Sequence, residues 1–487
     1  MLFNTIDFVI FFIIVLSTIA IIKKRKFQHL FLLAASYFFF YYTSNYLITL
    51  LIFTTLWDFY FGQAIWKATD QKTKKLLLIF SLAGNLGLLG FFKYADFAIL
   101  QFNILGQHFN LNSIPLLDFA LPIGISFYTF HSITYTVGIY RGIIQPVHLR
   151  EYALFVAFFP QIVAGPILRA HEFLPQLREK IEKSRTGYKI RQIIIENANL
   201  KLGITIMVFG FLKKMFIADN ISQLVEDVFV SPVGLDSFTI ILGTIAFGIQ
   251  IYCDFSGYSD IAIGAALILG FKLPVNFNKP YFATSPSEFW RRWHISLSTW
   301  LRDYLYIPLG GNKKSKFRTY FNLIIVMFLG GLWHGASWNF IIWGLLHGIY
   351  LSVHKAISDR FPQIGTGFFG TKIGKILSIL ITQYLVFLTW IAFRVKDTND
   401  MIYSMSKYVI LDLQITGAVQ FVTSHKFPII IMGIFIILHL ISYKKINLRE
   451  QVSNLKSLYW IAFLAGSMIL IFFFFDGNPE NFIYFQF

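Results

Sequence analysis

Residues 6–26 read IDFVIFFIIVLSTIAIIKKRK, a mainly apolar run that ends in a cluster of four cations at 23–26. A helix needs about 20 mostly apolar residues to cross the hydrocarbon core of a bilayer, so residues 6–22 are nearly long enough for one crossing. Basic loops stay on the cytoplasmic side, and only Asp7 is charged before the cluster. This stretch therefore predicts a membrane span whose N-terminal end lies outside the cytoplasm.

The composition extends this prediction to the whole chain. Of 487 residues, 56% are hydrophobic and only 14% are charged, whereas a soluble domain carries about a quarter charged residues. These values exclude a disordered chain and disfavour a soluble globule. The single cysteine, Cys253, excludes an intrachain disulfide and a cysteine-based zinc site. No spacing of histidine, aspartate and glutamate indicates a metal site, so none is expected.

The formal net charge of +17 indicates how such a chain is oriented in the membrane. Its lysines and arginines stand in short loops between apolar runs, as the positive-inside rule predicts, and no nucleic-acid-binding module is recognisable. Spans at 28–43 and 45–66 return the chain to the cytoplasm, and a last span at 457–475 places the tail 476–487 outside. We expect a single all-α domain over 1–487, a polytopic transmembrane helical bundle of roughly ten to twelve spans.

Some apolar runs are too short or too polar to cross cleanly. Residues 155–166, 257–271 and 289–309 contain proline or polar groups that must be buried in protein or face water. We expect these segments to be re-entrant or interfacial.

The polar residues at apolar depth are the best candidates for function, because they are costly in a membrane. They are densest between Asp254 and His347. His334 follows the apolar run 320–329, about 20 Å along a helix that leaves a cytoplasmic basic cluster. Two interpretations stay open: a neutral imidazole acting as a general base, or a core histidine in glycine-mediated helix packing. The supporting polar candidates are Asp254, Asp260, Arg302, Asp303 and Asn339.

Residues 287–304 show helical spacing of their apolar side chains, with Ser287 as the expected N-cap. An amphipathic interfacial helix explains this pattern, and His294 within it could still take part in chemistry. Asp254 and Asp260 could instead neutralise buried cations or cap helices. We expect structural rather than catalytic roles for the remaining histidines of interest, which are His131, His171, His347 and His354. The sequence contains no P-loop, dinucleotide-binding glycine pattern or GxSxG serine elbow.

The central block resembles the membrane-bound O-acyltransferase family, and within it the bacterial branch of the alginate O-acetyltransferase membrane subunit. The resemblance rests on YSDIAIG at 258–264, NFNKPY at 276–281, the run 289–312, LWHGASWN at 332–339, PIGISFYTF at 122–130 and FPQIVAGPI at 159–167. A related protein exports D-alanine onto teichoic acids.

The resemblance implies a helical bundle around a central funnel or tunnel, with a catalytic core at about 119–354. It implies that His334 is the catalytic histidine and His294 the second important one. The expected donor is acetyl-CoA, used as a substrate with no bound cofactor, and the acceptor is an envelope polysaccharide, alginate-like or peptidoglycan. Lys279, Arg291 and Arg292 are candidates for binding the donor's phosphates, or serve as ordinary cytoplasmic anchors.

The segment NFIYFQF at 481–487 resembles the C-terminal motif of the accessory peptide in the D-alanylation system, where a tyrosine is implicated as an acyl carrier. Tyr484 is therefore a candidate acyl relay to an extracytoplasmic SGNH-type acetyltransferase, since a phenolate with a pKa of about 10 is a good leaving group. The alternative is an aromatic membrane-interface anchor.

Two other functions remain as alternatives: D-alanyl transfer to teichoic acid from an acyl carrier, and a non-catalytic transporter. The leading interpretation is an O-acetyltransferase in contact with membrane lipid. The expected location is the bacterial inner membrane, with both termini outside.

Overall fold

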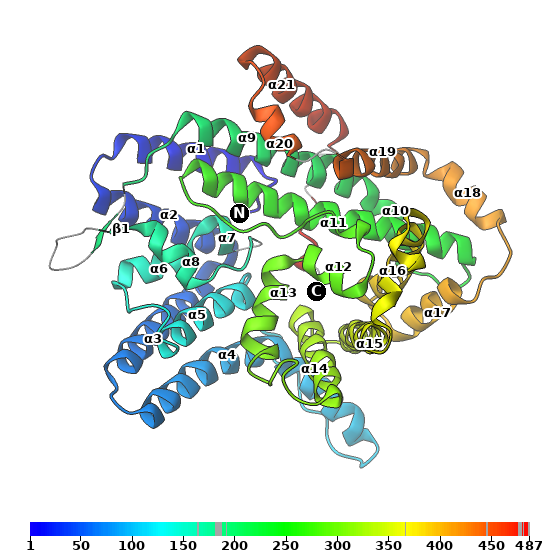
Figure 1. Ribbon diagram of the computed structural model, residues 1–487, viewed down its shortest axis with the longest axis horizontal. Coiled ribbons are helices and arrows are strands. Elements are labelled where there is room, and N and C mark those ends of the chain that lie inside the picture. The colour runs from blue at the N-terminus through cyan, green and yellow to red at the C-terminus, as the bar shows by residue number, and fades with distance from the viewer. Residues whose placement is uncertain are drawn as a thin grey trace. The chain divides into compact units, whose positions relative to one another are not determined.

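The computed structural model describes the chain except residues 163–164, 181–187, 191, 366, 445–446, 476–479, 481 and 486–487. Within the described part, the secondary structure is helical apart from one short antiparallel pair, β1 (Arg178–Lys180) and β2 (Tyr188–Ile190). Figure 1 shows the helices along the chain. The chain divides into two compact units. One contains residues 1–207 and 259–274, and the other contains residues 208–258 and 275–487.

The first unit is built from long apolar helices followed by short ones. Its helices begin where a side chain caps the free amides: Thr5 accepts from Phe8 N at 3.4 Å, and Asp70 accepts from Thr73 N at 2.8 Å. Its helices are α1 (Ile6–Ile21), α2 (Arg25–Ser44), η1 (Asn45–Leu47), α3 (Ile48–Lys67), α4 (Gln71–Gln107), α5 (Ile125–Tyr140), α6 (Leu149–Ala157), α7 (Phe159–Ile162), α8 (Ala170–Phe173), η2 (Leu174–Leu177) and most of α9 (Asn197–Phe211).

The second unit holds the polar motifs of the central block and the end of the chain. Its longest helix, α11 (Ser237–Ile268), begins in this unit and continues into the first. Its other helices are η3 (Leu212–Ala218), α10 (Asp219–Phe229), η4 (Pro280–Phe282), α12 (Pro286–Arg292), α13 (Ile295–Leu301), η5 (Arg302–Tyr306), α14 (Lys316–His334), α15 (Trp338–Arg360), η6 (Pro362–Gly365), η7 (Phe368–Gly370), α16 (Lys372–Arg394), α17 (Thr398–Val409), α18 (Thr416–Ser424), α19 (Lys426–Lys444), α20 (Leu448–Ser453), α21 (Ser457–Phe474) and η8 (Ile483–Phe485).

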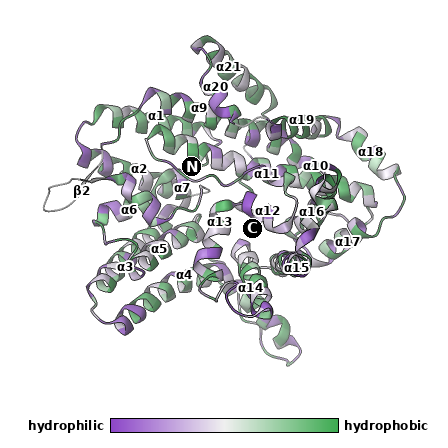
Figure 2. Cartoon of the chain, viewed as in Figure 1, coloured by the Kyte–Doolittle hydropathy of each residue, from purple (hydrophilic) through white to green (hydrophobic). Residues whose placement is uncertain are grey.

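Among the described residues, seven helices are long and apolar enough to cross a membrane. Figure 2 shows hydrophobic residues along these helices, and in α21 the mean hydropathy reaches 2.1. The protein is therefore a multi-pass membrane protein, which confirms the all-α polytopic prediction. The seven segments are 25–67, which contains α2 and α3, then 71–107, 237–268, 338–360, 372–394, 426–444 and 457–474.

The bounds of the predicted spans at the two ends of the chain agree with α1, α2, α3 and α21, but α1 has 16 residues and is not one of the seven long helices. The prediction of a separate re-entrant segment at 257–271 is wrong, because residues 257–268 continue the 32-residue helix α11. The polar groups in this run suggested a re-entrant or interfacial segment. Their neighbours are buried, however, and a helix satisfies its own backbone amides and carbonyls in any surroundings.

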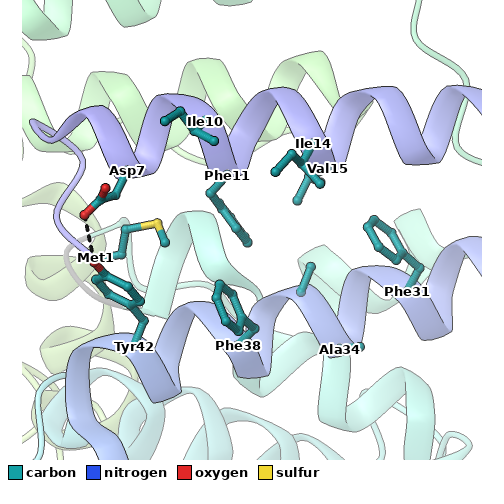
Figure 3. Close-up of a pocket in the computed structure, with 11 residues that line it drawn as sticks. Met1, Asp7, Ile10, Phe11, Ile14, Val15, Phe31, Ala34, Phe38 and Tyr42 are labelled. Atoms are coloured by element: carbon teal, nitrogen blue, oxygen red, sulfur yellow. Dashed lines mark hydrogen bonds between the residues drawn. The ribbon is translucent and has the colours of Figure 1, made fainter.

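A groove of about 470 Å³ lies between α1 and α2 in the first unit (Figure 3). Its walls are apolar side chains such as Phe11, Val15 and Phe38, with a hydrogen bond of 2.7 Å from the Tyr42 hydroxyl to Asp7 at one end. No predicted site residue lines this groove, and apart from Asp260 the predicted site residues belong to the second unit.

Candidate functional site

His294 stands at a break between two short helices. Ser285, rather than the expected Ser287, caps α12 by accepting a hydrogen bond from Glu288 N at 3.2 Å. The predicted continuous helix over 287–304 is wrong, because α12 ends at Arg292 and α13 starts at Ile295. His294 links them with φ +42° and ψ +53°. A left-handed conformation is unfavourable for a residue with a β-carbon, by about 1–2 kcal/mol.

The chain segment before α12 holds this break in place. Asn278 N donates to Arg292 O and Ile295 N donates to Asn276 O, each at 2.9 Å. The Ser296 hydroxyl donates to the side-chain oxygen of Asn276 at 2.6 Å. These bonds surround His294 in sequence, so the NFN part of the motif at 276–278 fixes the strained residue between the two helices.

The His294 side chain is fully buried, at 1% exposure. Neither ring nitrogen has a hydrogen-bond partner among the described residues. Burial lowers the pKa of His294 to about 3, so the ring is neutral at physiological pH. A neutral imidazole offers one donor and one acceptor nitrogen, and leaving both buried without partners is unfavourable. Such strained and unsatisfied groups occur most often at functional sites.

His334 is the last residue of α14 and is 6% exposed. Its ring lies among aromatic rings, with centroid distances of 4.9 Å to Trp343, 5.0 Å to Trp333 and 5.1 Å to Phe393. Trp333 also lies 6.1 Å from the ring of His294. The structure thus brings both predicted histidines next to one tryptophan, Trp333.

The glycines next to His334 serve helix packing. A β-carbon at Gly331 would lie 2.2 Å from Phe340 O, and one at Gly344 would lie 2.4 Å from Met327 O. Both distances are far below contact, so only glycine permits α14 and α15 to lie this close together (Figure 1). Close packing places Trp343 of α15 against His334 of α14.

Tyr484, in the short helix η8, lies beside both histidines. Its ring centroid is 5.3 Å from that of His334 and 6.3 Å from that of His294, with the His294 ring at 90° to it. Phe255 of α11 lies 4.8 Å away on a further side. Tyr484 is partly exposed, and burial together with the nearby Asp254 carboxylate raises its pKa above 10. Residues 476–479, 481 and 486–487 of the predicted tail lie outside the described residues.

Asp254 contacts a buried cation that the sequence analysis did not identify. Its Oδ1 atom lies 2.6 Å from Lys214 Nζ, and Lys214 is also 2.8 Å from Asp219 Oδ1. Burial lowers the pKa of an amine, but Asp254 and Asp219 outweigh it and raise the pKa of Lys214 above its usual value. Neutralisation of a buried cation was one of the alternatives for Asp254, and the geometry fits it.

The other supporting polar candidates in the second unit, Asn339, Arg302 and Asp303, have polar partners of their own. Asn339 donates to Val395 O at 2.7 Å and Lys396 O at 3.2 Å, and it accepts from the Thr398 hydroxyl at 2.9 Å, so it holds the α16–α17 connection. Arg302 pairs with the neighbouring Asp303 at 2.7 Å and is largely exposed. Asp260 is buried and belongs to the first unit, whereas both histidines belong to the second.

The candidate donor-binding cations differ in their surroundings. Arg292 forms a 2.6 Å ion pair with Glu288, which reduces its capacity for a phosphate. Arg291 is exposed. Lys279 is partly exposed and has a left-handed backbone, φ +49°, directly before η4. Arg291 and Lys279 are therefore the better candidates for a phosphate.

Among the histidines expected to be structural, His347 has the surroundings of one. The Trp290 indole N–H donates to His347 Nδ1 at 3.3 Å. His347 Nε2 therefore carries the proton of the ring, and it lies 3.0 Å from the Thr389 hydroxyl. Both nitrogens are satisfied, in contrast to those of His294. Sequence alone could not separate these two buried histidines.

Comparison with known proteins places these residues in a family context. Residues 67–395 match the model of the membrane-bound O-acyltransferase family. The chain is 39% identical to the peptidoglycan O-acetyltransferase of Helicobacter pylori, over 72% of this chain and 68% of the relative. It is 41% identical to the probable alginate O-acetylase AlgI of Pseudomonas aeruginosa, over 72% and 64%. A teichoic acid D-alanyltransferase of Streptococcus thermophilus is 30% identical over 48% and 57%.

Proposed function

The chain belongs to the membrane-bound O-acyltransferase family, and on that premise we propose that it transfers an acetyl group from a cytoplasmic thioester, acetyl-CoA, to hydroxyl groups of an envelope polysaccharide. The acceptor is peptidoglycan or an alginate-like polymer, because the relatives with about 40% identity are named for these two substrates. The acyl transfer takes place in the second unit, at His334.

The observation that carries this proposal is the placement of Tyr484 beside both histidines. Its ring centroid lies 5.3 Å from that of His334 and 6.3 Å from that of His294. The three rings come from segments far apart in the sequence. They combine a group that can accept a proton, a hydroxyl nucleophile and a neutral, buried polar ring. That set of groups is sufficient for general-base catalysis of acyl transfer to a hydroxyl.

In the proposed first step, the Tyr484 hydroxyl attacks the thioester carbonyl while His334 accepts its proton. The new C–O bond forms as the C–S bond breaks, and the imidazolium returns the proton to the leaving thiolate. A base is needed because the pKa of Tyr484 is raised above 10, so the phenol remains protonated at neutral pH. His294 stays neutral because its pKa is about 3, and it offers a hydrogen bond to the reacting carbonyl or phenol rather than a charge.

In the second step, an acceptor hydroxyl attacks the acetyl-tyrosine ester. The new ester bond to the acceptor oxygen forms as the bond to the phenolate breaks, and the proton of the acceptor hydroxyl passes to the phenolate, which regenerates Tyr484. An SGNH-type acetyltransferase outside the membrane is the proposed partner for this step. The central funnel that would let donor and acceptor approach from opposite sides remains a prediction.

The orientation is also part of the proposal. Basic clusters at 23–26 and 313–318 are assigned to the cytoplasm, with both termini outside the bacterial inner membrane. Lys279 and Arg291 then attract the donor's phosphates on the cytoplasmic side. D-Alanyl transfer is the second candidate, supported by the 30% identical teichoic acid D-alanyltransferases. The family assignment disfavours transport without acyl chemistry.

The test compares acetyl released by mild alkali from envelopes of cells that carry wild type, His334→Ala or Tyr484→Phe. Both variants should lose at least about 99% of the acetyl, because His334→Ala removes a general base that contributes about 100-fold or more and Tyr484→Phe removes the nucleophile. His425→Ala and Tyr459→Phe are matched controls outside the site; Tyr459 is exposed and His425 pairs with Asp227 at 2.9 Å. Full acetylation in cells with Tyr484→Phe would refute the acyl relay through Tyr484. Full acetylation in cells with His334→Ala would refute general-base catalysis by His334.

A further inference from the structure

A buried hydrogen bond connects the polypeptide that carries Tyr484 to α11. Ile483 N donates to Asp254 Oδ2 at 3.0 Å. The two residues joined by this peptide bond are buried as well, Phe482 at 0% and Ile483 at 3% exposure. The Phe482 ring lies 4.4 Å from Tyr258 and 5.6 Å from Phe255, both in α11. The tail thus docks on α11 one residue before Tyr484.

The position of Asp254 is set by Lys214. Lys214 lies in η3, a π-helical segment between α9 and α10, and it is 2% exposed. A β-carbon at Gly257 would lie 2.8 Å from Gly210 O and 3.1 Å from Lys214 N. Glycine at 257 therefore lets α11 approach the π segment closely enough for a 2.6 Å contact between Lys214 and Asp254. π-Helical segments are rare in proteins overall, and those that occur often lie at functional sites.

The two oxygens of Asp254 have different partners. Oδ1 contacts the Lys214 ammonium group, and Oδ2 accepts from the tail amide. Because the ammonium group fixes one oxygen and Asp219 fixes the ammonium group, the second oxygen is a stationary acceptor. Each oxygen of this carboxylate already has a donor that fixes its direction. Its geometry therefore suits positioning.

We infer that Lys214 and Asp254 are positioning residues, which anchor the tail through the Ile483 amide and so hold the Tyr484 ring between His334 and His294. The effect on catalysis rests on the proposed function of Tyr484, whereas the anchor itself does not. If Asp254 only neutralised Lys214, its second oxygen would not need to accept a hydrogen bond from the Ile483 amide. The test must therefore separate the hydrogen bond to the tail from the ion pair.

Ile483→Pro removes the donating N–H and leaves Lys214, Asp254 and Asp219 unchanged. Ile483 is the first residue of η8, a position where proline fits the backbone and the missing amide breaks no helical bond. Ile483→Val is the matched control, because it keeps the amide and the β-branched side chain. Hydrogen–deuterium exchange of the purified full chain in detergent measures docking through the amides that follow residue 483.

In Ile483→Pro, we expect those amides to exchange about tenfold faster or more, since a hydrogen bond to a charged group is lost. Acetyl transfer should fall by about tenfold in the same variant, while Ile483→Val stays within about twofold of wild type in both measurements. Equal exchange in the proline and valine variants would refute the anchor. Faster exchange with full activity in Ile483→Pro would refute the positioning role.

A second variant tests the other side of the bond. Asp254→Asn keeps an oxygen that can accept from Ile483 N but loses the charge that holds Lys214, so tail exchange should speed up by less than in Ile483→Pro. Unchanged tail exchange in Asp254→Asn would refute the part assigned to the ion pair. If Tyr484→Phe retains full activity with a protected tail, the proposed relay fails while the anchor stands, so the two ideas fail separately.

Discussion

Replacing His294 with phenylalanine should make the protein more stable and less active. Both ring nitrogens are buried without a partner among the described residues, and an unsatisfied buried polar group costs about 1–3 kcal/mol. Phenylalanine removes both atoms and keeps an aromatic ring beside Phe255, whose centroid is 4.6 Å away. A swap of similar volume costs less than about 1.5 kcal/mol in packing. The expected net gain at pH 7.5 is about 1 kcal/mol.

The gain should grow as the pH falls. The pKa of His294 is about 3 in the folded protein and 6.5 ordinarily, so between these values the unfolded chain binds a proton that the folded chain does not. Wild type therefore loses stability on acidification below pH 6.5, by up to about 1.4 kcal/mol per pH unit. At pH 5 this amounts to about 2 kcal/mol, which His294→Phe does not lose.

The assay is thermal unfolding of both proteins in the same detergent and at one scan rate, followed by tryptophan fluorescence. An unfolding entropy of about 2.1 cal/mol/K per residue makes 1 kcal/mol worth about 1 °C in Tm for a chain of this length. We expect His294→Phe to lie about 1 °C above wild type at pH 7.5 and about 3 °C above it at pH 5. Acetyl transfer should fall about 100-fold, the scale of a lost group in proton transfer or polar stabilisation.

His347→Phe is the matched control, because it also exchanges a buried histidine for phenylalanine. It leaves the Trp290 indole and the Thr389 hydroxyl without their partner, so Tm should fall at pH 7.5. A lower Tm for His294→Phe at pH 7.5, or an advantage that does not grow towards pH 5, would refute the reasoning about the buried ring. Full activity would refute a role for His294 in the chemistry.

Three further predictions concern packing, a loop and donor binding. Gly344→Ala places a methyl group 2.4 Å from Met327 O, so it should lower the stability by about 1–3 kcal/mol in thermal unfolding and separate α14 from α15. Asn339→Ala removes hydrogen bonds to the α16–α17 connection and should cost about 1–3 kcal/mol, with kcat reduced less than tenfold in acetyl-transfer assays. Lys279→Ala combined with Arg291→Ala should raise KM for acetyl-CoA by about tenfold with little change in kcat, and an unchanged KM would exclude these cations from donor binding.

The sequence predicted the ends of the fold well because apolar length and flanking charge decide a membrane span. The runs at 6–22 and 457–475 correspond to α1 and α21 within a residue or two. It failed at 257–271, where polar groups inside a continuous helix suggested a re-entrant or interfacial segment. It also failed at 287–304, because nothing in the helical spacing of the apolar residues shows that His294 adopts a positive φ.

The candidate site was predictable in its parts and not in its assembly. His334, His294 and Tyr484 were identified by motif resemblance, but 150 residues separate His334 from Tyr484, and no local pattern places the two rings 5.3 Å apart. Lys214 was missed altogether. A lysine in an apolar run is a signal that could have identified it, since a buried ammonium group requires a carboxylate partner, and Asp254 was already a candidate.

The unfavourable features of the second unit share one consequence. A left-handed His294 with unsatisfied nitrogens, a buried lysine between two aspartates and glycines in close helix contact each lower stability or restrict the sequence. Each could be replaced by apolar packing if stability were the only requirement. Instead, each fixes a ring: the break fixes His294, the glycine contact sets Trp343 against His334, and the Lys214–Asp254 pair fixes the backbone before Tyr484. Catalysis by positioned groups tolerates displacements of only about 1 Å, which gives these costs a physical reason.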